Sequence, residues 1–205
     1  MSIEFLFNQL KHPNPNLRDR AMSEIAESRD ETTIPRLMEI VGEDDTVYRR
    51  AAVRTLGFIG VDSVPFLVDS LLNSDSVTIR SSCAKALAQI AANLREVSFP
   101  DEAIEGLKKA LNDQNPIVHL SAAMALGEVG FPVIDLLIEV LQTTENLTLA
   151  VAIINALGSL DDKRVIEVLT ALAEDETADV YVQESATSAL SRLDLLKGYA
   201  QSQPK

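Results

Sequence analysis

Residues 47–57 read Val-Tyr-Arg-Arg-Ala-Ala-Val-Arg-Thr-Leu-Gly, and related segments recur along the 205-residue chain. Clear copies begin at Leu17 and Ile79, and weaker copies begin at Val118, Leu149 and Val182. Counted from Tyr48 in the quoted segment and from the start of each other copy, an aliphatic anchor follows eight residues later, at Ile25, Leu56, Leu87, Leu126, Leu157 and Leu190. Successive anchors are 31, 31, 39, 31 and 33 residues apart. Such a period is typical of stacked repeat proteins, in which each repeat buries its apolar face against its neighbours.

The composition predicts an all-α protein. Hydrophobic residues make up 46% of the chain and charged residues 24%, which is ordinary for a folded soluble protein. Aromatic residues make up only 4% and tryptophan is absent, so small and aliphatic side chains must fill the core, as in closely spaced helices. Together with the repeats, this predicts an α-solenoid, a superhelix of about six helix-hairpin repeats.

Each repeat is expected to contain a first helix, a polar turn and a second helix that carries the anchor. The first helices are predicted at Ile3–Leu10, Pro35–Val41, Pro65–Leu72, Ala103–Leu111, Val133–Leu141 and Val165–Ala173. The turns between the helices contain Asn, Asp, Ser or Thr, which cap helices and form turns. Residues 1–197 are expected to form one solenoid domain, and residues 198–205 a disordered tail.

The longest spacing between anchors, from Leu87 to Leu126, exceeds the basic period by eight residues. The extra residues fall near 91–101, a segment that ends in Ser98-Phe99-Pro100-Asp101. Insertions in repeat proteins emerge at one edge and are often used for binding, although a surface loop without a function is equally compatible with the sequence.

The charge is acidic and uneven. The formal net charge is −13; residues 1–100 hold 11 basic and 14 acidic side chains, and residues 101–205 hold 7 and 17. An acidic chain repels phosphate groups, so binding to nucleic acid or to anionic lipid is not expected.

The cysteine content and the N-terminal sequence favour a cytoplasmic protein. Cys83 is the sole cysteine, which excludes an internal disulfide and fits a reducing compartment. The start Met-Ser-Ile-Glu-Phe does not resemble a targeting signal, and no apolar run is long enough to span a membrane, so no transmembrane segment is expected.

No catalytic motif is apparent in the sequence. Only His12 and His119 are available as histidines, and neither belongs to a metal-binding or nucleophile motif, so no metal site is expected. His119 occupies the repeat position held by Arg18, Arg49 and Arg80, where we expect a structural contact with backbone or Asp groups. Cys83 aligns with small residues in the other repeats, which predicts packing in the core instead of reactivity.

The face of the second helices opposite the core is the candidate functional surface. Arg50 and Arg54 are four residues apart and therefore lie on one side of their helix. The aligned positions in the following repeats include Lys85, then the apolar residues Leu120, Met124 and Val151. A basic stretch that leads into an apolar one suits a ligand with carboxylates at one end and a conjugated apolar body. It also suits a protein partner, and scattered exposed apolar residues without a function are common.

The segments at 47–57 and 118–127 resemble the short HEAT-like repeats of phycobilin lyases. The resemblance extends from about Ile3 to about Leu195. In size and repeat number, the chain is similar to the smaller, F-type subunit of the heterodimeric E/F phycobilin lyases. Its sequence lacks an Asn-His-Cys-Gln-Gly-Asn type motif, so the resemblance favours bilin attachment without isomerisation.

The resemblance implies an enzyme subunit, active only with a larger E-type repeat subunit. The pair would bind an open-chain tetrapyrrole, phycocyanobilin, and deliver it as substrate to a cysteine of a phycobiliprotein, the phycocyanin α subunit. It implies no permanently bound cofactor and a location near thylakoid-associated phycobilisomes. Bilin or partner contacts are then expected at Arg50, Arg54 and Lys85, for propionates or an acidic partner surface, and at Leu120, Met124 and Val151 for the apolar contact. The alternative is a non-enzymatic repeat adaptor that binds phycobilisome proteins during assembly or degradation.

Overall fold

A computed structural model describes residues 2–94 and 98–202 of the chain. These residues form twelve α-helices and two short 3-10 helices, with no β-strand in the described ranges. The first helices of the six repeats are α1 (Ile3–Gln9), α3 (Thr33–Ile40), α5 (Val64–Asn73), α7 (Asp101–Ala110), α9 (Ile134–Thr143) and α11 (Lys163–Glu174). The second helices are α2 (Pro15–Glu27), α4 (Thr46–Ile59), α6 (Val77–Asn93), α8 (Pro116–Val129), α10 (Leu147–Leu157) and α12 (Val180–Ser202). The predicted all-α fold of helix-hairpin repeats is confirmed.

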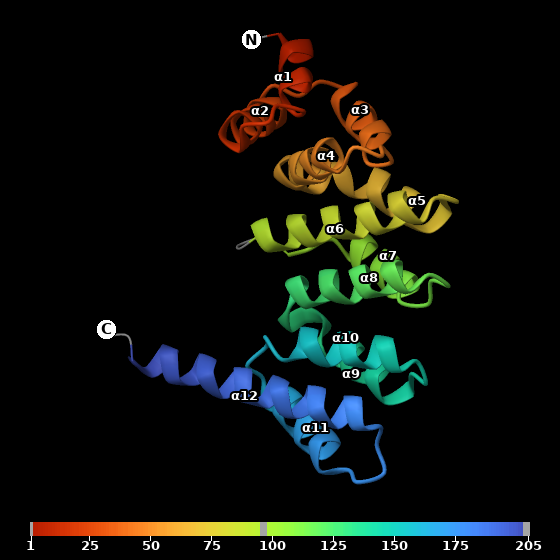
Figure 1. The fold of residues 1–205 in the computed structure, drawn as a ribbon, viewed down its shortest axis with the longest axis vertical. Helices are drawn as coiled ribbons and strands as arrows, with labels where there is room; N and C mark the ends of the chain where they lie inside the picture. The colour runs from red at the N-terminus through yellow and green to blue at the C-terminus, as the bar shows by residue number, and fades with distance from the viewer. Residues whose placement is uncertain (1, 95–97, 203–205) are drawn as a thin grey trace. The chain divides into compact units, whose positions relative to one another are not determined.

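The helices group into two compact units, Met1–Ala125 and Leu126–Lys205. In the N-terminal unit, α2 packs on α4 and α4 on α6, while α5 packs on α7 (Figure 1). In the C-terminal unit, α10 and α11 both pack on α12. One solenoid domain over residues 1–197 stays a prediction.

Helix α12 extends further than the sequence predicts. It remains helical through Ser202, past residue 198, where the disordered tail was expected to begin. Once a helix is nucleated, each added residue gains a backbone hydrogen bond at low cost, so nearness to the chain end does not by itself stop it. Residues 203–205 lie outside the described residues.

Polar residues in the turns start most of the second helices, as the sequence predicts. Asn14, Asp45 and Asn146 each accept a hydrogen bond from a backbone N–H in the first turn of α2, α4 and α10. The Ser76 side chain caps α6 in the same way. These side chains satisfy N–H groups that have no partner within the helix.

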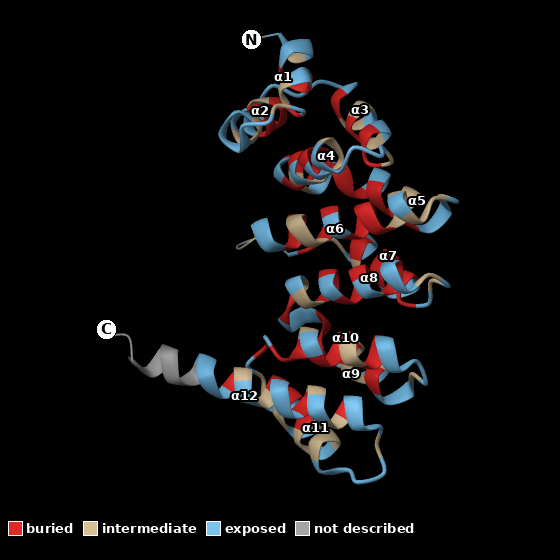
Figure 2. Cartoon of the chain, viewed as in Figure 1, coloured by how far each residue is buried: buried red, intermediate tan, exposed pale blue. Residues whose placement is uncertain are grey.

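The core lies along the seam between neighbouring helices (Figure 2). The anchors of the first five repeats are fully buried, whereas Leu190 is half-buried and Ala189 and Leu193 fill the core of the last repeat. The aligned position four residues before each anchor is buried throughout, at Ala21, Ala52, Cys83, Ala122, Ile153 and Ala186. Mostly small residues at this position let second helices approach closely.

Close approach is also visible at Gly158, at the end of α10. A Cβ atom added there would lie 2.7 Å from the Cβ of Ala189 on α12. Glycine is therefore required at this position for the two helices to pack as they do.

The insertion near 91–101 is partly an extension of α6, which continues to Asn93. The Asn93 side chain donates a hydrogen bond to the carbonyl oxygen of Gly57, at 3.1 Å. Phe99 is buried, and residues 95–97 lie outside the described residues. Both described ends of the insertion thus pack against the protein.

One helical stretch, Thr46–Asn73, is long and apolar enough by length and composition to cross a membrane, with a mean hydropathy of 1.5 over its best window. This is weak evidence, because 56% of that window is buried inside the protein. The stretch is also bent: α4 ends at Ile59, and Gly60 has a φ of 80° before α5 begins. Its apolar residues are accounted for by the core.

Arg80 and Asp113 form the most buried ion pair of the described residues. Arg80 Nε and Nη2 donate to the two carboxylate oxygens of Asp113 at 2.7 and 3.0 Å, and the side chains are only 16% and 12% exposed. The pair joins the first turns of α6 to the turn before α8. Burial raises the pKa of Asp113, but hydrogen bonds from Arg80 and from the Asn115 N–H lower it more, so the net shift is downward.

We expect Asp113→Asn to destabilise the protein by about 2 to 3 kcal/mol at pH 7, because Arg80 loses its counter-ion in a poorly hydrated position. Urea unfolding of the full chain measures the loss. The matched control is Asp62→Asn, which breaks the exposed pair with Arg29 (2.8 Å, side chains 41% and 55% exposed) and should cost less than about 1 kcal/mol.

The Asp113 effect should also depend on pH. A lowered pKa in the folded state means that the stabilisation is present above the unfolded pKa of about 3.9 and is lost as the pH falls through the folded pKa. The difference in the free energy of unfolding between the parent and Asp113→Asn should therefore become smaller in acid. Equal losses for the Asp113 and Asp62 variants at pH 7 would show that the buried pair does not hold the repeats together.

Candidate ligand-binding face

The second helices of the N-terminal unit present a row of exposed side chains on the side away from the core, which we call the second-helix face. On α4 this face consists of Val47, Arg50, Arg54 and Phe58, all exposed and spaced three or four residues apart. The aligned position on α6 is Lys85, also exposed. The predicted exposure of the three cations is confirmed.

Arg54 is already engaged within the protein. Its Nη1 donates to Asp19 Oδ1 on α2 at 2.8 Å, and its guanidinium lies 5.8 Å from the centre of the Phe58 ring. Because the Asp19 carboxylate neutralises it, Arg54 contributes little net positive charge to the face.

Arg50 and Lys85 differ from Arg54, since neither has a hydrogen bond or ion pair within the described residues. Helix α4 packs directly on α6, and partial burial together with the charges of Arg49 and Arg50 lowers the pKa of Lys85. The two side chains thus form a cationic pair whose members repel each other.

The apolar part of the second-helix face lies on α8. Met124 is 61% exposed, Ile117 is 54% exposed and Leu120 is 39% exposed, and the three are spaced three or four residues apart. The sequence identified Leu120 and Met124 but missed Ile117, as it missed Val47 and Phe58. Extending each pair by one helical turn would have found all three.

Val151 does not extend this row within the same compact unit. It is half-buried on α10, which belongs to the C-terminal unit, whereas the other five predicted residues belong to the N-terminal unit. Its contribution to a ligand-binding face stays a prediction.

The arginines at the repeat position of Arg49 have a structural role. Arg18 donates to the carbonyl oxygens of His12 and Pro13, and Arg49 and Arg80 donate to carbonyl oxygens five and six residues earlier in the same way. His119 retains part of this contact, with Nδ1 3.4 Å from the carbonyl oxygen of Asp113. The predicted structural reading of His119 agrees with this geometry.

Cys83 is fully buried in the core, and burial raises the pKa of its thiol to about 12. A thiol with so high a pKa carries almost no thiolate at neutral pH, and the thiolate is the nucleophilic form. Within residues 2–94 and 98–202, no three His, Cys, Asp or Glu side chains gather in a way that could hold a metal ion.

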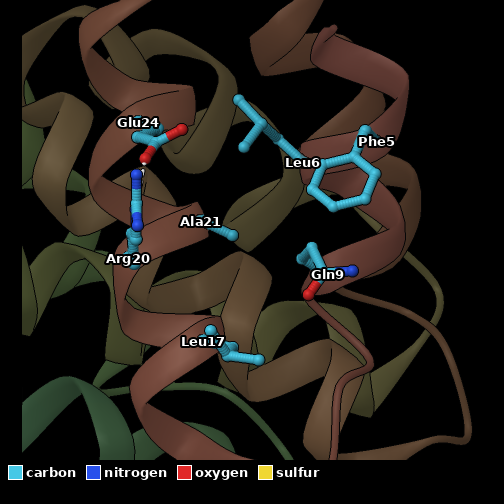
Figure 3. A pocket seen from close by; sticks show the side chains of 7 residues that line it. All are labelled: Phe5, Leu6, Gln9, Leu17, Arg20, Ala21 and Glu24. Carbon is cyan, nitrogen blue, oxygen red and sulfur yellow. Dashed lines mark hydrogen bonds and ion pairs between the residues drawn. The ribbon is translucent and has the colours of Figure 1, made fainter. Parts of the chain in front are cut away.

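Two apolar clefts in the described part of the chain are lined by residues other than those of the second-helix face. Figure 3 shows an apolar cleft of about 200 Å³ between α1 and α2, lined by Phe5, Leu6 and Leu17, with the Arg20–Glu24 ion pair (2.6 Å) at its rim. A second apolar cleft of about 320 Å³ lies between α9 and α11, beside Leu141 and Val168. The first is smaller than ordinary small-molecule sites, and neither has an unpaired cation at its edge.

Comparison with known proteins identifies relatives over nearly the whole chain. The family description "HEAT repeats" matches residues 3–88 and 104–191, and "PBS lyase HEAT-like repeat" matches residues 79–113. An uncharacterized phycocyanin operon protein Z from Pseudanabaena tenuis (strain PCC 7409) is 55% identical, over 97% of this chain and 98% of its own length. The bilin biosynthesis protein CpeZ from Synechococcus sp. (strain WH8020) is 31% identical, over 85% and 96%.

A solved structure shares the fold. A chain from the complex of CpcE and CpcF of phycocyanin lyase from Nostoc sp. PCC7120 superposes with a TM-score of 0.50 at 20% identity, covering 75% of this chain and 96% of the matched chain. At this identity the likeness concerns the helical-repeat architecture.

We expect Cys83 to be inert in the folded protein, because its thiol is inaccessible and protonated. Iodoacetamide at pH 8 should leave the intact mass unchanged in buffer and should add one alkyl group in urea. A Ser23→Cys variant, which places a thiol at an exposed position of α2, should gain one group in buffer and serves as the control. Rapid alkylation of the parent in buffer would contradict the buried assignment.

Proposed function

Because this chain belongs to the HEAT-repeat phycobilin lyase-like family, we propose that it is one subunit of a heterodimeric phycobilin lyase. In this proposal it acts with a larger E-type repeat subunit, binds phycocyanobilin and promotes its attachment to a cysteine of the phycocyanin α subunit. The observation that carries the proposal is the second-helix face, where the unpaired cations Arg50 and Lys85 share one compact unit with the exposed aliphatic side chains of α8.

The relatives support the choice of substrate. One is a phycocyanin operon protein and another a bilin biosynthesis protein, so two related chains are connected by name with phycobiliproteins or their chromophore. A bilin has an extended conjugated body and two propionates. The chemistry of the second-helix face suits both parts, with guanidinium and ammonium groups for the carboxylates and aliphatic side chains for the rings.

The proposed reaction requires little chemistry from this chain. The thiol of the acceptor cysteine adds across the ethylidene double bond of the bilin: a carbon–sulfur bond forms, the thiol hydrogen ends on the neighbouring carbon, and no oxidant or reductant is needed. Since Cys83 is buried and protonated, the nucleophile belongs to the acceptor. The contribution of this chain is to hold the bilin extended and correctly oriented, which can lower the barrier by replacing a bimolecular encounter with a prepared one.

A second candidate function is a non-enzymatic adaptor that binds phycobilisome proteins during their assembly or degradation. The observation that favours it is the exposure of Ile117 and Met124, since exposed apolar residues in a row also suit a protein interface. Under this alternative the chain binds protein but transfers no chromophore. Both functions place the chain in the cytoplasm beside phycobilisomes.

Reconstitution in a heterologous host tests the proposal. Phycocyanin α subunit, the enzymes of phycocyanobilin synthesis and an E-type subunit are coexpressed with and without this chain, and covalently bound bilin is scored by fluorescence on a denaturing gel. We expect the signal only when the chain is present. An equal signal without it would overturn the lyase proposal and favour the adaptor.

A variant of this chain tests, in the same experiment, whether the acceptor supplies the nucleophile. Cys83→Ala removes the sole thiol of the chain, and bilin attachment should be retained because the acceptor supplies the nucleophile. Loss of attachment by a variant that remains folded, as judged by urea unfolding, would show that Cys83 takes part in transfer.

A further inference from the structure

Arg50 differs from every other arginine in the described part of the chain. Every other arginine in residues 2–94 and 98–202 donates hydrogen bonds to a carboxylate, a backbone carbonyl oxygen or a polar side chain. Arg50 has no such partner, although it is exposed on a protein with 31 acidic side chains.

Lys85 increases the positive charge at this position. It lies near the middle of α6, on the helix that packs beside α4. Its ammonium is close enough to Arg49 and Arg50 for the positive charges of both to act on it. Arg49 lies beside them but is engaged with the carbonyl oxygens of Glu43 and Asp44.

Helix ends do not account for these two cations. Lys108 and Lys109 also lack ion pairs, but they lie in the last turn of α7, where the helix dipole favours positive charge. Arg50 lies in the N-terminal half of α4 and Lys85 in the interior of α6, so neither gains from a helix C-terminus. Their mutual repulsion is therefore not offset within the described part of the protein.

We propose that Arg50 and Lys85 form a two-point clamp for a pair of carboxylates on one ligand, and that Arg54 is not part of it. The identity of the ligand rests on the proposed function: the carboxylates are the two propionates of the bilin. Each propionate replaces the missing counter-ion of one cation, and the bilin body then extends along the exposed aliphatic side chains of the second-helix face. Arg54 keeps Asp19 as its partner and acts on the orientation of α2 against α4.

Titration of purified full chain, alone and together with an E-type subunit, tests the clamp. The probes are phycocyanobilin and its dimethyl ester, which has the same conjugated body without the two negative charges; absorbance of the bilin reports binding. We expect the free acid to bind at least about tenfold more tightly than the ester. Raising the salt concentration should reduce the difference in affinity between the free acid and the ester, because salt screens exposed charge pairs.

The variants Arg50→Gln and Lys85→Gln should each weaken binding of the free acid by about tenfold and should leave binding of the ester within about twofold. The matched controls are Arg54→Gln, which removes one positive charge from the same face, and Lys109→Gln, which removes one from α7. Both controls should bind the free acid within about twofold of the parent. Because all four residues are exposed, urea unfolding is expected to show that each variant folds.

Several outcomes would overturn the clamp. The proposal is wrong if the free acid and the ester bind equally tightly, or if the Arg50 and Lys85 variants bind the free acid as tightly as the parent does. It is also wrong if Arg54→Gln loses as much affinity for the free acid as those two variants. Hexaglutamate serves as a probe for an acidic protein surface. If it binds the parent but not the Arg50 and Lys85 variants, while the bilin binds neither the chain alone nor the chain with the E-type subunit, the bilin assignment is wrong. Chromophore attachment in the coexpression experiment is scored separately, so the clamp can fail while the lyase function stands.

Discussion

Close packing of the second helices is the constraint on which the rest of the structure depends. One position per repeat, four residues before the anchor, is buried in all six repeats, and in five of them it holds Ala or Cys. A small side chain there lets one helix approach the next, and Gly158 shows how little room remains. Once this spacing is set, the helical period determines which residues face the core and which form the exposed row.

The neighbouring residues Arg49 and Arg50 show how the packing separates structure from function. Consecutive residues on a helix point about 100° apart. Arg49 therefore turns back toward the preceding turn and donates to its carbonyl oxygens, as Arg18 and Arg80 do in their repeats. Arg50 points out on the second-helix face and finds no partner. The same side chain thus holds a turn in one position and is available to a ligand in the next.

The sequence predicts the hairpins well because their signals are local. Period, turn residues and anchors all lie within one repeat, so each of the six first helices is found to within a few residues, and the exposure of Arg50 and Lys85 follows from helical spacing. The Arg54–Asp19 pair could not be predicted in this way, because it joins side chains 35 residues apart and depends on how two helices are rotated against each other. The disordered tail from residue 198 was expected because chain ends are often poorly ordered, whereas α12 continues to Ser202.

An acidic protein that binds a dianion needs local positive charge, since its net charge of −13 opposes the approach of the ligand. At physiological salt the Debye length is about 8 Å, so most of this repulsion is screened and the charges next to the ligand dominate. A paired cation must give up its partner before it can bind a ligand, so Arg54 adds little to the two cations that have no counter-ion. Asp19 therefore affects the site indirectly. Because it pairs with Arg54, the positive potential of the second-helix face is confined to Arg50 and Lys85.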